Sequence, residues 1–247
     1  MTRSLVAAVA VACIAIAPRV HAQIPQRFEN LQELPTDIPR DTLIEIMRGF
    51  TRALGVRCTH CHTGGTDQSL EGMNFASDDK LAKQRARFMM RMVSDLNTSV
   101  LDSLPGGRDT PAVRVTCVTC HRGLSRPATL ESVLAATIDS LGVPAAITRY
   151  RDLRRETMAL GRYDFGETSI NELARSLAAR GKTAEAIAML ELNGEFHPSS
   201  PAIDFSIAEL HRQRGERDQA LRRYRMVLEK APNHRQAQRR LEEMGGR

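Results

Sequence analysis

Two copies of the five-residue pattern Cys-x-x-Cys-His constrain this chain more than any other feature of its sequence. The first copy runs from Cys58 to His62 and the second from Cys117 to His121. Two thiols separated by two residues can each add to one vinyl group of a haem, and the histidine that follows then lies beneath the iron as its proximal ligand. The sequence therefore predicts two covalently bound haems c. The predicted attachment and proximal positions are Cys58, Cys61 and His62 for the first haem and Cys117, Cys120 and His121 for the second.

Zinc binding is the main alternative for the same cysteines. A Cys-x-x-Cys pair also occurs in zinc sites and redox disulfides, and two pairs together supply four zinc ligands. Neither of those uses needs a histidine directly after each pair, whereas haem c attachment does. The fifth cysteine, Cys13, lies in a leader that we expect to be removed, so the two motifs use every cysteine of the mature chain. Haem attachment is the favoured interpretation.

The N-terminal residues have the pattern of a secretory signal peptide. A basic residue precedes an apolar run of 13 residues, Leu5 to Ala17, and small residues form a cleavage site that ends at Ala22. We expect a signal peptide over residues 1–22 and a periplasmic or otherwise exported protein, which agrees with haem c because that cofactor is attached outside the cytoplasm. The apolar run is short for a bilayer span. A leader retained as an anchor is the alternative, and nothing in the mature chain indicates membrane association.

The charge of the mature chain is mild. Residues 23–144 hold 14 Lys plus Arg and 14 Asp plus Glu, whereas residues 145–247 hold 19 and 15, so the total is +4 once the leader is removed. The sequence has no Trp and 4% aromatic residues, which leaves no platform for stacking bases. These values give no indication of nucleic-acid binding.

Helical signals precede each haem motif. The first helix is predicted to start at Asp41 or Thr42 as its cap and to stop at Gly55. The second is predicted to start at Ser77 as its cap and to reach about Asn97. Gly and Pro residues mark loops between the helices and the motifs.

Methionines on the two predicted helices are candidates for the distal iron ligands. From Met47 the first helix has about two turns left, roughly 10 Å, before the chain can reverse and bring a haem back along the helix. The second helix offers Met89, Met90 and Met92, of which the first and last share a face at i and i+3. Ordinary core filling is the competing interpretation for each of these methionines.

Several segments outside the haem motifs carry a family resemblance. They are Asn74 to Lys80, Ala86 to Met92 with Leu96 to Thr98, and Val115 to Gly123 with Pro127. Over about Pro35 to Pro127, the chain resembles the multihaem cytochrome c subunit of photosynthetic reaction centres. That family typically carries four haem motifs, whereas this chain has two.

The resemblance implies an arrangement for each haem. In that family a methionine-ligated haem lies along the helix that supplies the methionine, and a turn and the Cys-x-x-Cys-His motif follow. The positions that match are Met47 for the first haem and Met89 for the second. Met92 would then be a packing residue.

The C-terminal residues contain an internal repeat. Five pairs of similar residues are each 34 positions apart: Leu173 and Ile207, Ala174 and Ala208, Gly181 and Gly215, Ala186 and Ala220, and Pro198 and Pro232. This is the tetratricopeptide period. Two repeats are one fewer than the usual stable minimum, so we expect helices at 145–160 and 235–244, or the haem domain, to support them. The groove of such an array commonly binds protein segments, and a purely structural cap is the alternative.

These patterns together predict an all-α protein. A two-haem cytochrome c domain of helix-turn-motif units at 23–140 is followed by a short tetratricopeptide-like array at 141–247. An iron held by Met and His has no open position for a substrate and moves single electrons, so we expect an electron-transfer protein with redox partner proteins, no catalytic residues and no enzymatic activity. The alternative is a haem enzyme of the peroxidase type, which needs one open iron and a nearby acid-base residue.

Overall fold

The structure is a computed structural model that describes residues 24–107 and 112–245. Within these ranges the regular elements are all helical, apart from two isolated β-bridges at 63–74 and 66–69. The predicted all-α fold is therefore confirmed. None of the described helices has the length and apolar character needed to cross a bilayer. The predicted signal peptide at 1–22 lies outside the described residues.

The described chain divides into two compact units. The first contains residues 24–51 and 56–115, and the second contains residues 52–55 and 116–245. The first haem motif thus lies in the first unit, and the second motif begins the second unit. The domain boundary predicted between 140 and 141 stays a prediction.

Helix α1, Arg40–Leu54, begins earlier than the sequence predicted. The N–H of Leu43 donates to the carbonyl of Pro39 at 3.0 Å, so the proline and not Asp41 or Thr42 precedes the first turn. Proline suits this position because its φ is already near the helical value. The predicted end is confirmed, since the helix stops at Leu54 and Gly55 follows with a φ of 65°.

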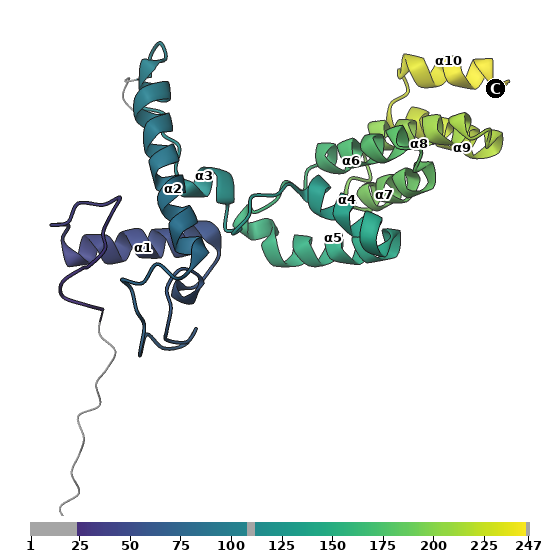
Figure 1. The fold of residues 1–247 in the computed structure, drawn as a ribbon. Coiled ribbons are helices and arrows are strands. Elements are labelled where there is room, and N and C mark those ends of the chain that lie inside the picture. Colours follow the sequence, from purple (N-terminus) through teal and green to yellow (C-terminus); the bar gives the residue numbers. More distant parts are fainter. Residues whose placement is uncertain (1–23, 108–111, 246–247) are drawn as a thin grey trace, which may run out of the picture. The chain divides into compact units, whose positions relative to one another are not determined.

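Helix α2, Leu81–Asp95, starts four residues after the expected cap. Ser77 does not cap it, because its hydroxyl donates to the Asp79 carboxylate at 2.5 Å and accepts from the Asp79 N–H at 3.1 Å. Lys83 also holds the preceding turn through the carbonyls of Phe75, Ala76 and Ser77. The helix then continues into a π-helical turn, Leu96–Val100, and a 3₁₀ turn, Leu101–Ser103. The axes of α1 and α2 run crosswise (Figure 1).

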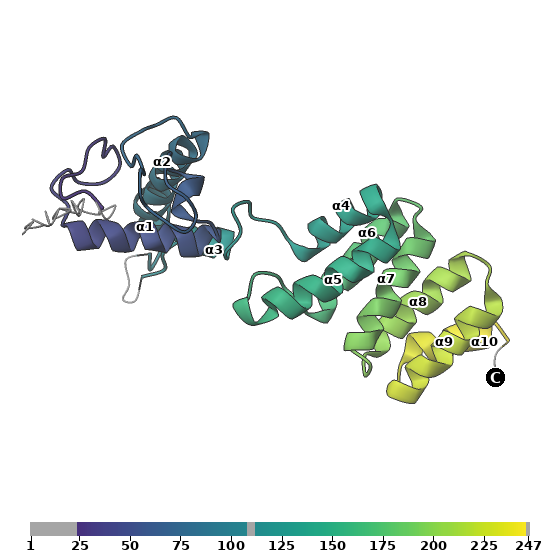
Figure 2. The same ribbon diagram turned by 90° about the horizontal axis from the view of Figure 1, so that it is seen from below.

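The second unit begins with the short helix α3, Cys117–His121, and continues as a stack of antiparallel helices (Figure 2). These are α4 (Leu130–Leu141), α5 (Val143–Thr157), α6 (Glu167–Ala179), α7 (Thr183–Phe196), α8 (Pro201–Gln213), α9 (Arg217–Lys230) and α10 (Arg235–Glu243). Helices α6 and α8 start 34 residues apart (201 minus 167), as do α7 and α9 (217 minus 183). The predicted 34-residue period is confirmed.

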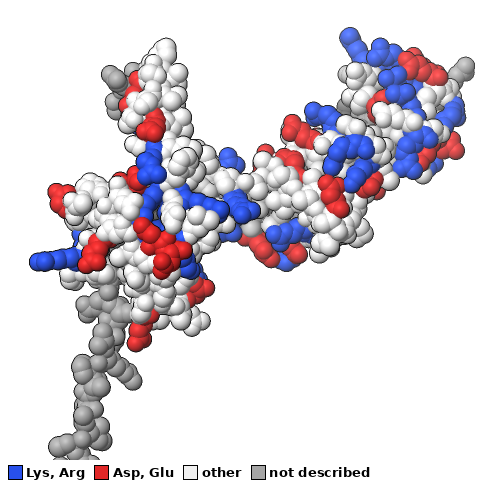
Figure 3. Space-filling view, in the orientation of Figure 1, with Lys and Arg blue, Asp and Glu red and all other residues white. Residues whose placement is uncertain are grey.

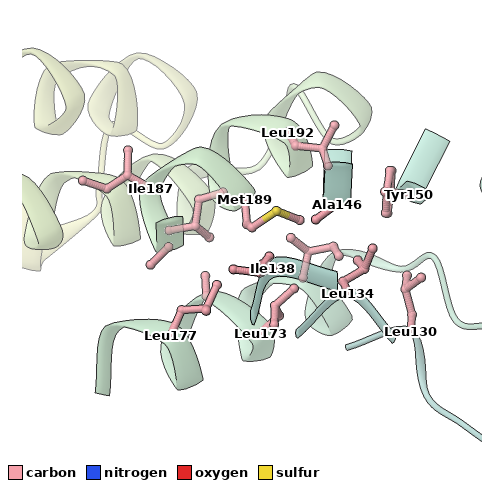
Figure 4. Packing of buried hydrophobic residues seen from close by; sticks show 14 of the residues in the cluster. Leu130, Leu134, Ile138, Ala146, Tyr150, Leu173, Leu177, Ile187, Met189 and Leu192 are labelled. Carbon is pink, nitrogen blue, oxygen red and sulfur yellow. The ribbon is translucent and has the colours of Figure 1, made fainter. Parts of the chain in front are cut away.

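Helix α4 was missed by the sequence analysis, although it belongs to the core of the stack. Its N-cap is Thr129, which accepts from the Ser132 N–H at 3.3 Å, and its residues Leu134 and Ile138 are 0% and 5% exposed. Figure 4 shows them beside Met189 of α7. A threonine followed by leucine and isoleucine at intervals of four was the available signal. These contacts place α4 with the repeats, although the predicted boundary assigns it to the haem domain.

Charged side chains also stabilise the last helices of the array. Asp204 is 3% exposed, and its carboxylate pairs with Arg223 at 3.0 Å and Lys230 at 2.5 Å. A buried carboxylate requires such partners, because an isolated buried charge is very costly. Figure 3 shows basic and acidic side chains interspersed on the visible face of α8, α9 and α10. Part of the basic excess of the C-terminal residues therefore serves internal ion pairs.

Candidate haem-binding site

The first Cys-x-x-Cys-His motif folds as a single helical turn. The N–H groups of Cys61 and His62 both donate to the carbonyl of Cys58, at 3.1 Å and 3.0 Å. Residues at i, i+3 and i+4 lie on one side of a helical turn. Both thiols and the imidazole therefore share one face, as attachment of one haem requires.

The second motif has the same local form in α3. The Thr116 N–H donates to the Thr119 hydroxyl at 3.0 Å at the start of the turn, and the Arg122 N–H donates to the Val118 carbonyl at 3.1 Å at its end. The same spacing gives the two thiols and His121 a common face. The cysteines of both motifs, Cys58, Cys61, Cys117 and Cys120, form no disulfide with one another.

The imidazole of His121 is oriented by the backbone that follows it. Its Nδ1 lies 2.7 Å from the carbonyl oxygen of Leu124, which can only accept, so Nδ1 donates and Nε2 is the ring nitrogen left to bind a metal. The chain reaches this geometry through left-handed residues at Arg122 and Gly123, with φ of 49° and 81°. A non-glycine residue in that region costs about 1 kcal/mol or more. The left-handed turn therefore fixes the orientation of the His121 ring.

The imidazole of His62 is held by burial and by an aromatic contact. Its ring meets Phe75 edge to face, with centroids 5.1 Å apart. Burial lowers the pKa of His62, and the Lys83 charge acts in the same direction, although the backbone of Phe75 opposes them. Its buried Nδ1 has no hydrogen bond of normal geometry among the described residues. A neutral imidazole is the form that binds a metal.

Apolar side chains around the motifs are left largely uncovered by protein. Among the described residues before Leu130, the only buried apolar ones are Leu43 and Ala53. On α2, Leu81, Phe88 and Met92 are 54%, 61% and 41% exposed, and their spacing places them on one face. A folded domain of this size normally buries such residues. The large apolar face of a haem would cover these exposed apolar side chains. The residues present therefore fit the cofactor.

The predicted distal ligands lie on the helices that precede the motifs. Met47 is half-buried on α1 and Met89 is half-buried on α2. Met47 and His62 both belong to the first unit. Both distal assignments stay predictions. With respect to the zinc alternative, the described residues contain no group of three His, Cys, Asp or Glu side chains placed to hold a metal ion.

Asn97 is a positioning residue that the sequence analysis overlooked. Its side-chain amide donates to the Val115 carbonyl and accepts from the Val115 N–H, both at 2.8 Å. The side-chain amide thus forms the same pair of hydrogen bonds that a neighbouring backbone would form. These bonds connect the end of α2 to the segment that leads into the second motif. Asn97 lies in a mostly polar stretch, Ser94 to Ser99, so no distinct sequence signal indicated this role.

Two glycines, Gly55 and Gly123, allow a close backbone contact. The contact joins the segment just before the first motif to the segment just after the second motif. The Gly123 N–H donates to the Ala53 carbonyl at 2.8 Å, and a Cβ on Gly55 would lie 2.0 Å from the Gly123 carbonyl oxygen. Real Cβ atoms do not approach an oxygen so closely. Only glycine at position 55 permits this contact.

We expect Gly55→Ala to lower the free energy of unfolding of the second unit by about 3 kcal/mol, because left-handed strain adds to the backbone clash. Gly161→Ala is the matched control, since Gly161 has a φ of 63° but no atom within 4 Å of its Cβ position. That control should lose only about 1 kcal/mol. Urea unfolding followed by circular dichroism measures both, and equal losses would show that the close approach contributes nothing.

Comparisons with known proteins match the region that contains both motifs. Residues 19–137 match the family model described as photosynthetic reaction centre cytochrome C subunit. The photosynthetic reaction center cytochrome c subunit of Rubrivivax gelatinosus is 37% identical over 92 residues, which is 33% of this chain and 23% of that protein. Cytochrome c-554 of Chloroflexus aurantiacus is 37% identical over 89 residues, which is 36% of this chain and 18% of that protein. The chain therefore spans about a fifth of the length of these relatives.

Among the solved structures that are similar to part of the chain is the Yersinia enterocolitica type III secretion chaperone SycD in complex with a peptide of the translocator YopD. The similarity has a TM-score of 0.31 and 19% sequence identity, and it covers 47% of this chain and 86% of the chaperone.

Proposed function

Because residues 19–137 belong to the photosynthetic reaction centre cytochrome c subunit family, we propose that this protein is an exported dihaem c-type cytochrome that carries single electrons between redox partner proteins. The observation that carries the proposal is the pair of Cys-x-x-Cys-His turns, each with its thiols and imidazole on one face. Bound haem c supplies a one-electron couple of ferric and ferrous iron.

Each residue of the two motifs has a defined part in this proposal. Cys58 and Cys61 hold the first haem, and Cys117 and Cys120 hold the second. The proximal ligands are His62, whose pKa is lowered by burial, and His121, whose ring is oriented by the Leu124 carbonyl. With Met47 and Met89 on the distal sides, both irons are saturated. A saturated iron exchanges electrons without binding a substrate, and a thioether ligand raises its reduction potential.

The helical array is proposed to be an interaction module. Its repeated hairpins have hydrophobic cores of their own. One cluster joins buried residues of α4 to α8, and a second joins buried residues of α8, α9 and α10. Stacked hairpins of this kind present an extended surface to protein segments. Such a surface would hold the cytochrome beside a partner protein.

Haem content and ligation test this function in one preparation. We expect purified protein to contain two covalent haems per chain, and the oxidised form to show the far-red charge-transfer band of methionine on ferric haem. The reduced protein should not bind carbon monoxide, because neither iron has an open position. Stoichiometric zinc without haem would refute the proposal. Carbon monoxide binding by one iron of the unaltered protein would favour the peroxidase-type enzyme.

A further inference from the structure

A lysine outside the haem motifs contacts the first motif directly. The ammonium group of Lys80, the residue just before α2, donates to the carbonyl of Thr59 inside the motif. Lys80 is half-buried and forms no ion pair among the described residues. Its charge is therefore not neutralised by a carboxylate at close range.

Neighbouring charges divide into paired and unpaired groups. Lys83 and Arg87 both pair with Asp78, at 3.1 Å and 2.8 Å, so one carboxylate is shared between two positive charges. The Asp67 carboxylate accepts from the Thr59 hydroxyl but is exposed, and water screens an exposed charge more than a half-buried one. Lys80 is a cation that hydrogen-bonds to the motif backbone and has no carboxylate partner among the described residues.

The ammonium group of Lys80 lies within one hydrogen bond of the backbone between Cys58 and Cys61. At that place its charge contributes a positive potential at the motif. A positive potential favours whichever oxidation state carries one more electron.

We propose that Lys80 raises the reduction potential of the first haem, an inference that rests on the proposed function. One electron from a redox partner protein converts the ferric iron to ferrous iron, so the net charge at the motif falls by one. The ammonium group stabilises that reduced state more than the oxidised state. Lys80 acts through the field at the motif and does not ligate the iron.

Helix geometry provides a matched control on α2. Lys80, Lys83 and Arg87 follow at i, i+3 and i+7 and share one side of the helix. Arg85 is exposed and lies on the other side, where the spacing also places Met89. Replacing Arg85 also removes one positive charge, five residues from Lys80, and among the described residues no hydrogen bond or ion pair joins Arg85 to the first motif.

The test is a spectroelectrochemical titration of the full-length holoprotein. A variant with Cys117→Ala and Cys120→Ala retains only the first haem and identifies its potential. Lys80→Gln should lower the equilibrium constant for reduction of that haem about three- to tenfold, where tenfold corresponds to about 59 mV for one electron. Lys80→Arg should restore the wild-type value and Arg85→Gln should leave it unchanged. The difference in first-haem potential between the wild-type protein and Lys80→Gln should become smaller as salt is added, because salt screens the charge.

Two results would overturn the inference. One is an unchanged first-haem potential in Lys80→Gln that still carries both haems. The other is an equal shift in Lys80→Arg, which would mean that the hydrogen bond to Thr59 matters and the charge does not. If Lys80→Gln fails to retain haem, Lys80→Met is the second neutral variant, because it keeps the aliphatic stem. A wild-type chain without covalent haem would instead refute the proposed function.

Discussion

Cys120→Ala combined with Cys117→Ala is expected to reduce the covalent haem content from two per chain to one. Each thioether needs its own thiol, and the remaining turn at residues 58–62 still has both of its cysteines and His62. Mass spectrometry of the denatured protein counts the attached haems directly. Cys58→Ala combined with Cys61→Ala is the reciprocal variant and should retain only the second haem. Loss of both haems from either double variant would contradict independent attachment.

Removal of all four motif cysteines should have a larger structural effect. The described residues before Leu130 bury only Leu43 and Ala53 among their apolar side chains, whereas the array has a core without any cofactor. The haem-free first unit should therefore become sensitive to proteases while α4 to α10 stay folded. Limited proteolysis with identification of the protected fragment measures this. A haem-free protein that resists cleavage throughout would show that haem is not needed as a core.

Met47→Ala is expected to open the first iron to carbon monoxide and to lower its reduction potential by roughly 0.1 V or more, within the about 0.8 V range that axial ligands control. The thioether stabilises ferrous iron, so its loss favours the oxidised state. Met89→Ala should have the same effect on the second iron. Optical redox titration and the carbon monoxide difference spectrum report both changes.

Met92→Ala is the control for these ligand variants. Met92 is 41% exposed on the same helix as Met89, and its truncation should leave both potentials and the spectrum nearly unchanged. If Met92→Ala opens an iron while Met89→Ala does not, the ligand lies three residues further along α2 and the assigned register is wrong.

Local spacing was enough to predict the parts of the protein that depend on one helical turn or one repeat. The common face of Cys58, Cys61 and His62 follows from positions i, i+3 and i+4, whatever the rest of the chain does. The stop at Gly55 and the 34-residue period of the hairpins follow equally from local geometry. These features need no knowledge of distant residues.

Local reasoning was wrong where two local interactions compete. Ser77 has the side chain of a good helix cap, but its hydroxyl bonds to Asp79 and its carbonyl is held by Lys83. The start of α2 therefore moves to Leu81. The choice between a helix cap and a tight turn depends on which of the nearby partners the Ser77 hydroxyl bonds.

Only the tertiary structure decided the contacts that join residues far apart in the sequence. Lys80 meets Thr59 across 21 positions, Asn97 meets Val115 across 18, and Gly123 meets Ala53 through a close backbone approach. The sequence by itself determined the two haem motifs and the repeat, because each is complete within a few turns of chain. Distant residues can position those motifs only after the whole backbone has folded and brought them together. No local sequence pattern specifies such contacts.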